Sequence, residues 1–322
     1  MKIILSRKGF DSQYGGVPSP ILPDGTLLPF SIPDPHGPIC YSDIGQDNSA
    51  GGLCPVPDDS LAQRLERATR GRLTGADRTH LDPDLNTTDR PRAENWRPAF
   101  GQTGSAEGHL RKQGIGRGDL FLFFGWFRQY DADLRPLRNA PDLHVLFGWL
   151  LVEEVISIGP HTEAFRKDWP CYREHPHALI QNQKLNSLYR AAEQLPRWIT
   201  SPRGPDETGN QDTSLFAPLP GGGLFPTLNA TRTLTATTQQ ANPTGKRSLW
   251  QLPHSFHRPG QDGPVAPLSY HGNPKFWTPA PKDRRKNHDW LLQSVPKGQE
   301  FVLDLKNRSG LKKWIRDLFA ED

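Results

Sequence analysis

The first loop of the sequence combines cations, a carboxylate and a hydroxyl group. Together these groups could bind an anionic substrate and act on it chemically. Arg7 and Lys8 follow a short apolar run, and Asp11 and Ser12 come just before a glycine pair. The cations suit a phosphate or carboxylate, and Asp11 could act as a base or a nucleophile. We expect Arg7, Lys8 and Ser12 to bind substrate and Asp11 to be catalytic. A turn pinned by an Arg7–Asp11 pair explains the loop equally well.

A second group of functional side chains occupies residues 268–273. Tyr270 can stack on a nucleobase, His271 can move a proton and Asn273 offers the donor and acceptor pair that reads an adenine-like edge. We therefore expect Tyr270 and His271 to be catalytic and Asn273 to bind substrate. A β-turn held by its own hydrogen bonds is the equal alternative.

A third group, His80, Asp82 and Asp84, has alternate spacing, which would place the three side chains on one side of an extended segment. Two carboxylates are few for a metal, and Asp82 precedes a proline as turn residues often do, which favours a structural role. If these residues hold a cation, magnesium or manganese suits them better than zinc. His175 and His177 also lie close together, but no third ligand follows them at a recognisable spacing.

Two strongly apolar segments, residues 120–128 and 143–158, both contain Phe-Gly-Trp and predict paired central strands covered on both faces. With the preceding helix and glycine turn, residues 101–158 resemble the core of PUA-like and EVE-like barrels. That resemblance implies base binding, with Trp126 and Arg128 as substrate-binding residues. The competing interpretation is that Trp126 fills the core.

The chain contains 30 Gly and 32 Pro among 322 residues, which indicates few long helices and many ordered loops. We expect an α+β fold with a mixed, β-rich core, forming one compact domain over residues 1–322 with an exposed excursion at residues 204–223. Further strands are expected at residues 2–6 and 299–305, and helices at 59–70, 105–113 and 309–319.

The overall charge is modest, because 39 Lys and Arg oppose 35 Asp and Glu. Local clusters therefore matter more than the total for any contact with phosphates. Cys40, Cys54 and Cys171 lack metal or disulfide spacing, and neither a signal peptide nor a membrane span is recognisable. We expect a cytoplasmic protein.

Several sequence blocks, in order along most of the chain, resemble the third family of nucleotide-modification-associated domains. They are residues 2–12 with 15–21, 80–84, 118–128, 268–273 and 298–304. The resemblance implies a phage or bacterial system that makes or handles modified bases, with nucleotide or DNA as the partner and other base-modification enzymes nearby. We expect an enzyme of transferase or glycosidase type acting on a nucleotide or nucleobase. A non-catalytic reader of modified bases is the alternative.

Overall fold

The computed structural model describes residues 1–45, 60–200, 218–257, 267–281, 289–296, 298–306 and 308–320. Cys54 and residues 204–217 of the expected excursion lie outside these ranges. The last residues of that excursion, Gly222 and Gly223, are described and begin a strand of the main sheet.

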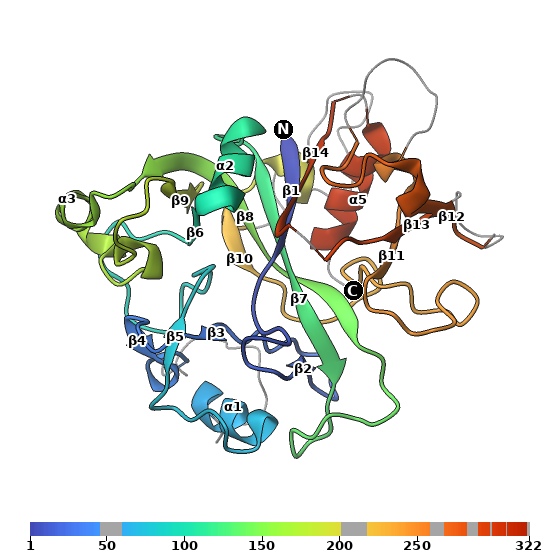
Figure 1. The fold of residues 1–322 in the computed structure, drawn as a ribbon, viewed down its shortest axis with the longest axis horizontal. Helices are drawn as coiled ribbons and strands as arrows, with labels where there is room; N and C mark the ends of the chain where they lie inside the picture. Colours follow the sequence, from blue (N-terminus) through green and yellow to red (C-terminus); the bar gives the residue numbers. More distant parts are fainter. Residues whose placement is uncertain are drawn as a thin grey trace.

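The main sheet is mixed and contains eight strands (Figure 1). Its path runs β14-β1-β7-β8-β9-β6, with β10 attached to β8 and β2 attached to β7. The bounds are β1 (Lys2–Arg7), β2 (Ser19–Ile21), β6 (Ala99–Thr103), β7 (Leu120–Gln129), β8 (Leu143–Ser157), β9 (Asn186–Ala191), β10 (Gly222–Leu224) and β14 (Glu300–Asp304). β1 pairs with β7 in parallel and with β14 in antiparallel fashion, so that Lys2 lies opposite Asp304.

Both faces of this sheet are buried, as the apolar runs predicted. Successive residues of β1 point to opposite faces of the sheet, so that Ile4 and Leu5 belong to two different apolar clusters. One cluster is completed by α4 (Arg197–Thr200), α5 (Ser309–Phe319) and a small sheet of β11 (Leu249–Leu252), β12 (Trp277–Pro279) and β13 (Trp290–Gln293). The other cluster fills the concave side and includes Phe100, Phe121 and Phe123.

The expected PUA-like barrel is not confirmed, because the described strands do not close into a barrel. β14 and β6 stand at opposite ends of the sheet path and do not pair. They approach only through side chains, where Gln102 Nε2 donates to Glu300 Oε1 over 2.6 Å. Helix α2 (Gly104–Lys112) contacts β14, β6 and β9 and so covers this gap. The α+β class is confirmed, with a strongly curved open sheet in place of the barrel.

Two smaller groups of elements flank the sheet (Figure 1). One contains α1 (Leu61–Thr69) and a three-stranded sheet of β3 (Ile32–Pro33), β4 (Ile39–Cys40) and β5 (Arg78–His80). The other contains α3 (Thr162–Asp168) and packs on β9. Short 3-10 turns are η1 (Tyr41–Asp43), η2 (Pro170–Tyr172), η3 (Pro176–Ala178), η4 (His254–Phe256) and η5 (Pro274–Phe276).

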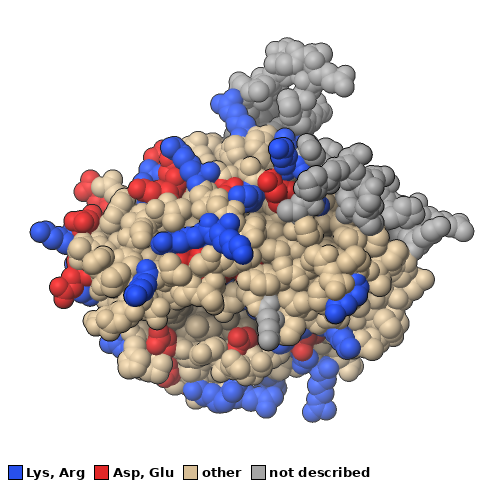
Figure 2. All heavy atoms as spheres, turned by 45° about the horizontal axis from the view of Figure 1, so that its top comes forward, with Lys and Arg blue, Asp and Glu red and all other residues tan. Residues whose placement is uncertain are grey.

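The surface carries charges of both signs over the described residues of the face in Figure 2. This distribution agrees with the small net charge and directs attention to local clusters of cations. None of the described helices combines the length and apolarity that a bilayer span requires. Cys40 and Cys171 are free thiols.

Candidate functional site

Arg7 is fixed at the end of β1, where the parallel register sets it opposite Phe124 of β7. Its guanidinium lies 5.8 Å from the centroid of the Phe124 ring and 5.9 Å from that of Phe301. The same group donates to the carbonyls of Val295 and Pro296, each over 3.2 Å. These contacts hold the cation in one place at the end of β1.

A second arginine, Arg247, completes a pair of cations with Arg7. Its guanidinium carbon lies 4.2 Å from the centroid of the Trp126 ring, and the nitrogens of the guanidinium make no hydrogen bond or ion pair with the residues that the structure describes. Burial lowers the pKa of Arg7, the charge of Arg247 lowers it further, and Asp11 acts in the opposite sense. The two cations are therefore close enough to repel each other, which is the arrangement that a bound anion relieves.

His144 lies beneath this pair of arginines on β8. Its Nδ1 accepts a hydrogen bond from Trp250 Nε1 over 2.9 Å, so the neutral ring carries its proton on Nε2. Burial holds the pKa of His144 well below its ordinary value, and the charges of Arg7 and Arg247 add to this effect. His144 is thus a neutral support for the aromatic floor of the site.

Asp11 shapes the loop that follows Arg7. Its Oδ1 accepts hydrogen bonds from the backbone N–H groups of Gln13 and Tyr14, each over 2.7 Å, and its own N–H donates to the carbonyl of Tyr14. The carboxylate therefore organises a tight turn through the backbone, and not through the Arg7–Asp11 pair that the alternative interpretation invoked. Oδ2 makes no hydrogen bond within the described chain, and Ser12 is exposed at the tip of the turn.

Lys8 points away from Arg7, toward the concave side of the sheet. Its Nζ lies 3.3 Å from Glu300 Oε1 and 4.5 Å from the centroid of the Phe100 ring. Consecutive residues of an extended segment face opposite ways, so these neighbours do not surround one guest. Two buried polar atoms near Lys8, Ser6 Oγ and Glu300 Oε2, have no hydrogen-bond partner among the described residues.

The 268–273 segment lies beside Arg7 and shares its contact with Phe301. The His271 ring is 4.9 Å from the Phe301 ring, and its two nitrogens meet the carbonyl of Ser269 and the N–H of Val295. Tyr270 is 47% exposed and packs against His109 at a tilt of 39°, with ring centroids 4.6 Å apart. His271 therefore holds the segment whose carbonyls receive Arg7, and Tyr270 is the exposed ring.

Two of the other expected binding residues have structural partners. Asn273 is exposed, and its Oδ1 accepts from the N–H of Lys275 at the start of η5. Arg128 pairs with Asp142 over 2.8 Å. Trp126 remains half-buried beneath Arg247, and its Nε1 has no hydrogen-bond partner among the described residues.

The fold divides the third group, for which metal binding was the alternative to a structural role. His80 and Asp82 lie with His177 of η3, and one potential ligand atom from each falls within 4.8 Å of the others. Asp84 instead pairs with Arg90 and Arg92. The expectation assumed an extended segment, but β5 ends at His80.

The electrostatics of the His80–Asp82–His177 cluster are dominated by a buried carboxylate. Burial alone would raise the pKa of Asp82, but His175 and His177 beside it, in their protonated forms, lower that pKa well below its ordinary value. Burial lowers the pKa of His80, although Asp82 acts in the opposite sense.

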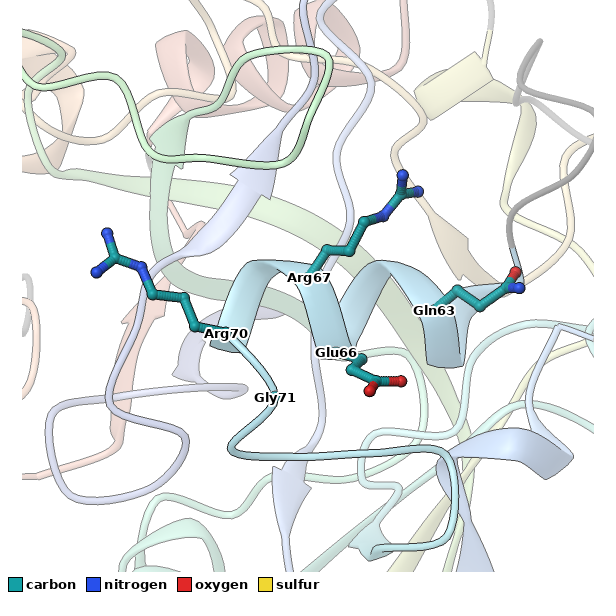
Figure 3. Close-up of a pocket in the computed structure, with 5 residues that line it drawn as sticks. All are labelled: Gln63, Glu66, Arg67, Arg70 and Gly71. Carbon is teal, nitrogen blue, oxygen red and sulfur yellow. The ribbon is translucent and has the colours of Figure 1, made fainter.

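A shallow hollow beside α1 is lined by Gln63, Glu66, Arg67, Arg70 and Gly71. Figure 3 shows that the four longer side chains diverge from one another and do not converge on a common point. The hollow therefore lacks the converging polar groups of a ligand site.

The pair of arginines over aromatic rings, with a carboxylate nearby, defines a candidate anion-binding site. The family profile described as nucleotide modification associated domain 3 matches residues 2–304. The match covers most of the chain, so the protein belongs to this family, whose name indicates a role in nucleotide modification and a nucleotide or DNA substrate. The comparisons with curated proteins and with solved structures give no match.

Sequence reasoning did not assign Arg247 to the site. It also missed His177 as a neighbour of Asp82 and Glu300 as the partner of Lys8. The alternation of side chains along β1 was the one local signal that could have separated Arg7 from Lys8.

Proposed function

We propose that the protein is an enzyme of nucleotide or DNA-base modification that binds its substrate at the Arg7–Arg247–Trp126 site. The observation that carries the proposal is the Arg247 guanidinium, which lies over Trp126 beside Arg7 without an acidic partner among the described residues. Membership of the family supports the substrate class.

The chemistry of this arrangement suits a nucleotide. A guanidinium that lies on an aromatic face keeps its edge N–H groups for a phosphate, and planar guanidinium and indole groups both stack on nucleobases. Arg7 is already oriented by the carbonyls of Val295 and Pro296, so it adds a second positive charge with little loss of side-chain freedom.

Asp11 is the candidate general base or nucleophile. Its Oδ1 is occupied by the backbone of the turn, whereas Oδ2 is available near both arginines. A second function has support from the same observation: because Asp11 already has a structural task, the site can bind a modified base without turnover. The protein would then be a reader of modified bases.

The binding step is tested by titrating the full chain with deoxynucleoside 5′-monophosphates and a short single-stranded DNA, with calorimetry as the readout. We expect Arg247→Gln to weaken binding at least tenfold, as loss of a charge-assisted contact worth about 1.5–3 kcal/mol requires. With the DNA, the slope of log affinity against log salt should fall by about 0.7.

Arg117→Gln is the matched control. Arg117 is also an arginine, but its side chain is 77% exposed and pairs with Glu153 at the surface. Equal affinities for the Arg247→Gln and Arg117→Gln variants would contradict the proposed site.

A further inference from the structure

The cluster around Asp82 has a feature that the proposed nucleotide site does not explain. His177 Nε2 lies 3.6 Å from Asp82 Oδ2, and both side chains are at most 5% exposed. The protonation of this imidazole can be assigned from its neighbours. Asn186 Nδ2 donates to the carbonyl of His177, which leaves Asn186 Oδ1 as the acceptor for His177 Nδ1–H over 2.9 Å.

This hydrogen bond determines what His177 presents to Asp82. Since the proton of the neutral ring is on Nδ1, Nε2 directs a lone pair at a carboxylate oxygen. Two electron-rich atoms that face each other in a buried site need a cation between them, either a proton or a metal ion.

His80 repeats the arrangement from the opposite side. Its Nδ1 lies 3.4 Å from Asp34 Oδ2, which leaves Nε2 as the free donor atom of the ring. A histidine that donates one ring N–H to a carboxylate or an amide oxygen while the other nitrogen binds an ion is the usual arrangement in metal sites. His80 and His177 both have such an outer partner.

His175 lies beside the carboxylate and directs an N–H, not a lone pair, toward it. Its Nδ1 accepts from the N–H of His177, so its proton is on Nε2, 3.5 Å from Asp82 Oδ1. Asp82 Oδ1 also accepts from the N–H of Gly101 over 2.7 Å. Asp82 Oδ1 is thus occupied by the protein, and Oδ2 is the oxygen that faces His177.

We propose that His80, Asp82 and His177 bind a divalent first-row transition-metal ion through two imidazole nitrogens and one carboxylate oxygen. Imidazole favours ions of the zinc and iron class over magnesium, so the donor set differs from the one expected from His80, Asp82 and Asp84. Bonds of about 2.1 Å to an ion require the ligand atoms to approach one another to about 3.0–3.4 Å, so binding contracts the cluster. His80 is 20% exposed, which leaves the remaining coordination positions on its side for water or substrate.

The test is a titration of EDTA-treated, full-length protein with Zn²⁺ by calorimetry and with Co²⁺ by visible absorption. We expect one ion per chain, a rise in melting temperature on binding, and no displacement by excess Mg²⁺. His177→Gln should weaken Zn²⁺ binding at least 100-fold. Asp34→Asn, which removes the charge behind His80 and replaces one of the two acceptor oxygens with an amide nitrogen, should weaken it about tenfold.

His161→Gln is the matched control, because His161 is an exposed histidine at the start of α3 and makes no capping hydrogen bond. It should bind Zn²⁺ as the unmodified protein does. Circular dichroism of each variant without metal separates misfolding from loss of a ligand. Two results would overturn the proposal: no stoichiometric binding by the unmodified protein, or equal affinities for the folded His177→Gln and His161→Gln variants. The cluster would then be a protonated hydrogen-bond network.

Discussion

Lys8 and Glu300 form a buried ion pair, 3.3 Å long, that joins the residue after β1 to the first residue of β14. Gln102 of β6 donates to the same carboxylate oxygen, so the pair also links the two ends of the curved sheet. The other oxygen of Glu300 and the neighbouring Ser6 Oγ have no hydrogen-bond partner among the described residues.

Breaking this pair on one side should be costly. Lys8→Met leaves a buried carboxylate without its cation, and we expect the free energy of unfolding to fall by about 3–5 kcal/mol. The Lys8→Met/Glu300→Gln double variant should lose clearly less, because it buries no lone charge. Urea denaturation gives these values. Lys313→Met, which breaks an exposed pair with Asp317, should cost only about 0.3–0.5 kcal/mol.

The Asp11→Asn variant distinguishes the two proposed functions, an enzyme and a non-catalytic reader of modified bases. The amide oxygen can still accept from the N–H groups of Gln13 and Tyr14, so the turn and the nucleotide affinity should persist. If Asp11 is the base, turnover falls by at least about 100-fold. The readout is mass spectrometry of nucleosides in DNA from cells that express each variant. A modified nucleoside that persists in the Asp11→Asn cells would remove Asp11 from the chemistry.

Acid should weaken the fold through His144. Because the pKa of this imidazole is lowered in the folded state, the unfolded chain binds more protons below about pH 6.5, and stability is lost as pH falls. The loss approaches about 1.4 kcal/mol per pH unit until the folded-state pKa is reached. Urea denaturation at pH 7.5 and 5.5 should show a smaller difference for His144→Asn, whose amide oxygen can replace Nδ1 as the acceptor for Trp250. An unchanged difference would assign the acid sensitivity to other groups.

Gly101→Ala should disturb the His177 cluster from the side of β6. A Cβ at Gly101 would lie 2.2 Å from two carbons of the His177 ring, so the imidazole must move. We expect a loss of about 1–3 kcal/mol in unfolding free energy and weaker Zn²⁺ binding. Gly116→Ala is the control, since a Cβ there meets nothing within 4 Å. Similar melting temperatures for the two variants would show that the ring is not held against the strand.

The elements with strong local patterns could be predicted from the sequence. Strands β7 and β8 could be predicted because each is a continuous apolar run. Helix α5 could be predicted because its apolar residues recur at helical spacing. The curvature of the sheet could not be predicted in this way. The sheet forms because β1 inserts between β7, to which it is parallel, and β14, to which it is antiparallel, and these two strands are far apart in the chain.

In the candidate sites, too, local features could be predicted from the sequence, whereas contacts between distant parts of the chain could not. The loop with Arg7 and Asp11 is visible as a local run of charged residues and glycines. The contact between Arg247 and Trp126, and that between His177 and Asp82, join separate parts of the chain, and no spacing rule brings them together. Asp84 lies two residues from Asp82 in the sequence, but its carboxylate pairs with Arg90 and Arg92 and does not join the His80–Asp82–His177 cluster.

The C-terminal helix α5 lies beyond residue 304, where the family match ends, yet Leu311, Ile315 and Leu318 are buried in the cluster beneath β1 and β7. Trp314 packs on Phe256, and Phe319 packs on Trp149. Expression of residues 1–304 alone would expose this apolar surface to solvent and favour aggregation. Truncated variants should therefore retain the helix. In this protein the boundary of the family match and the boundary of the cooperatively folding unit are different.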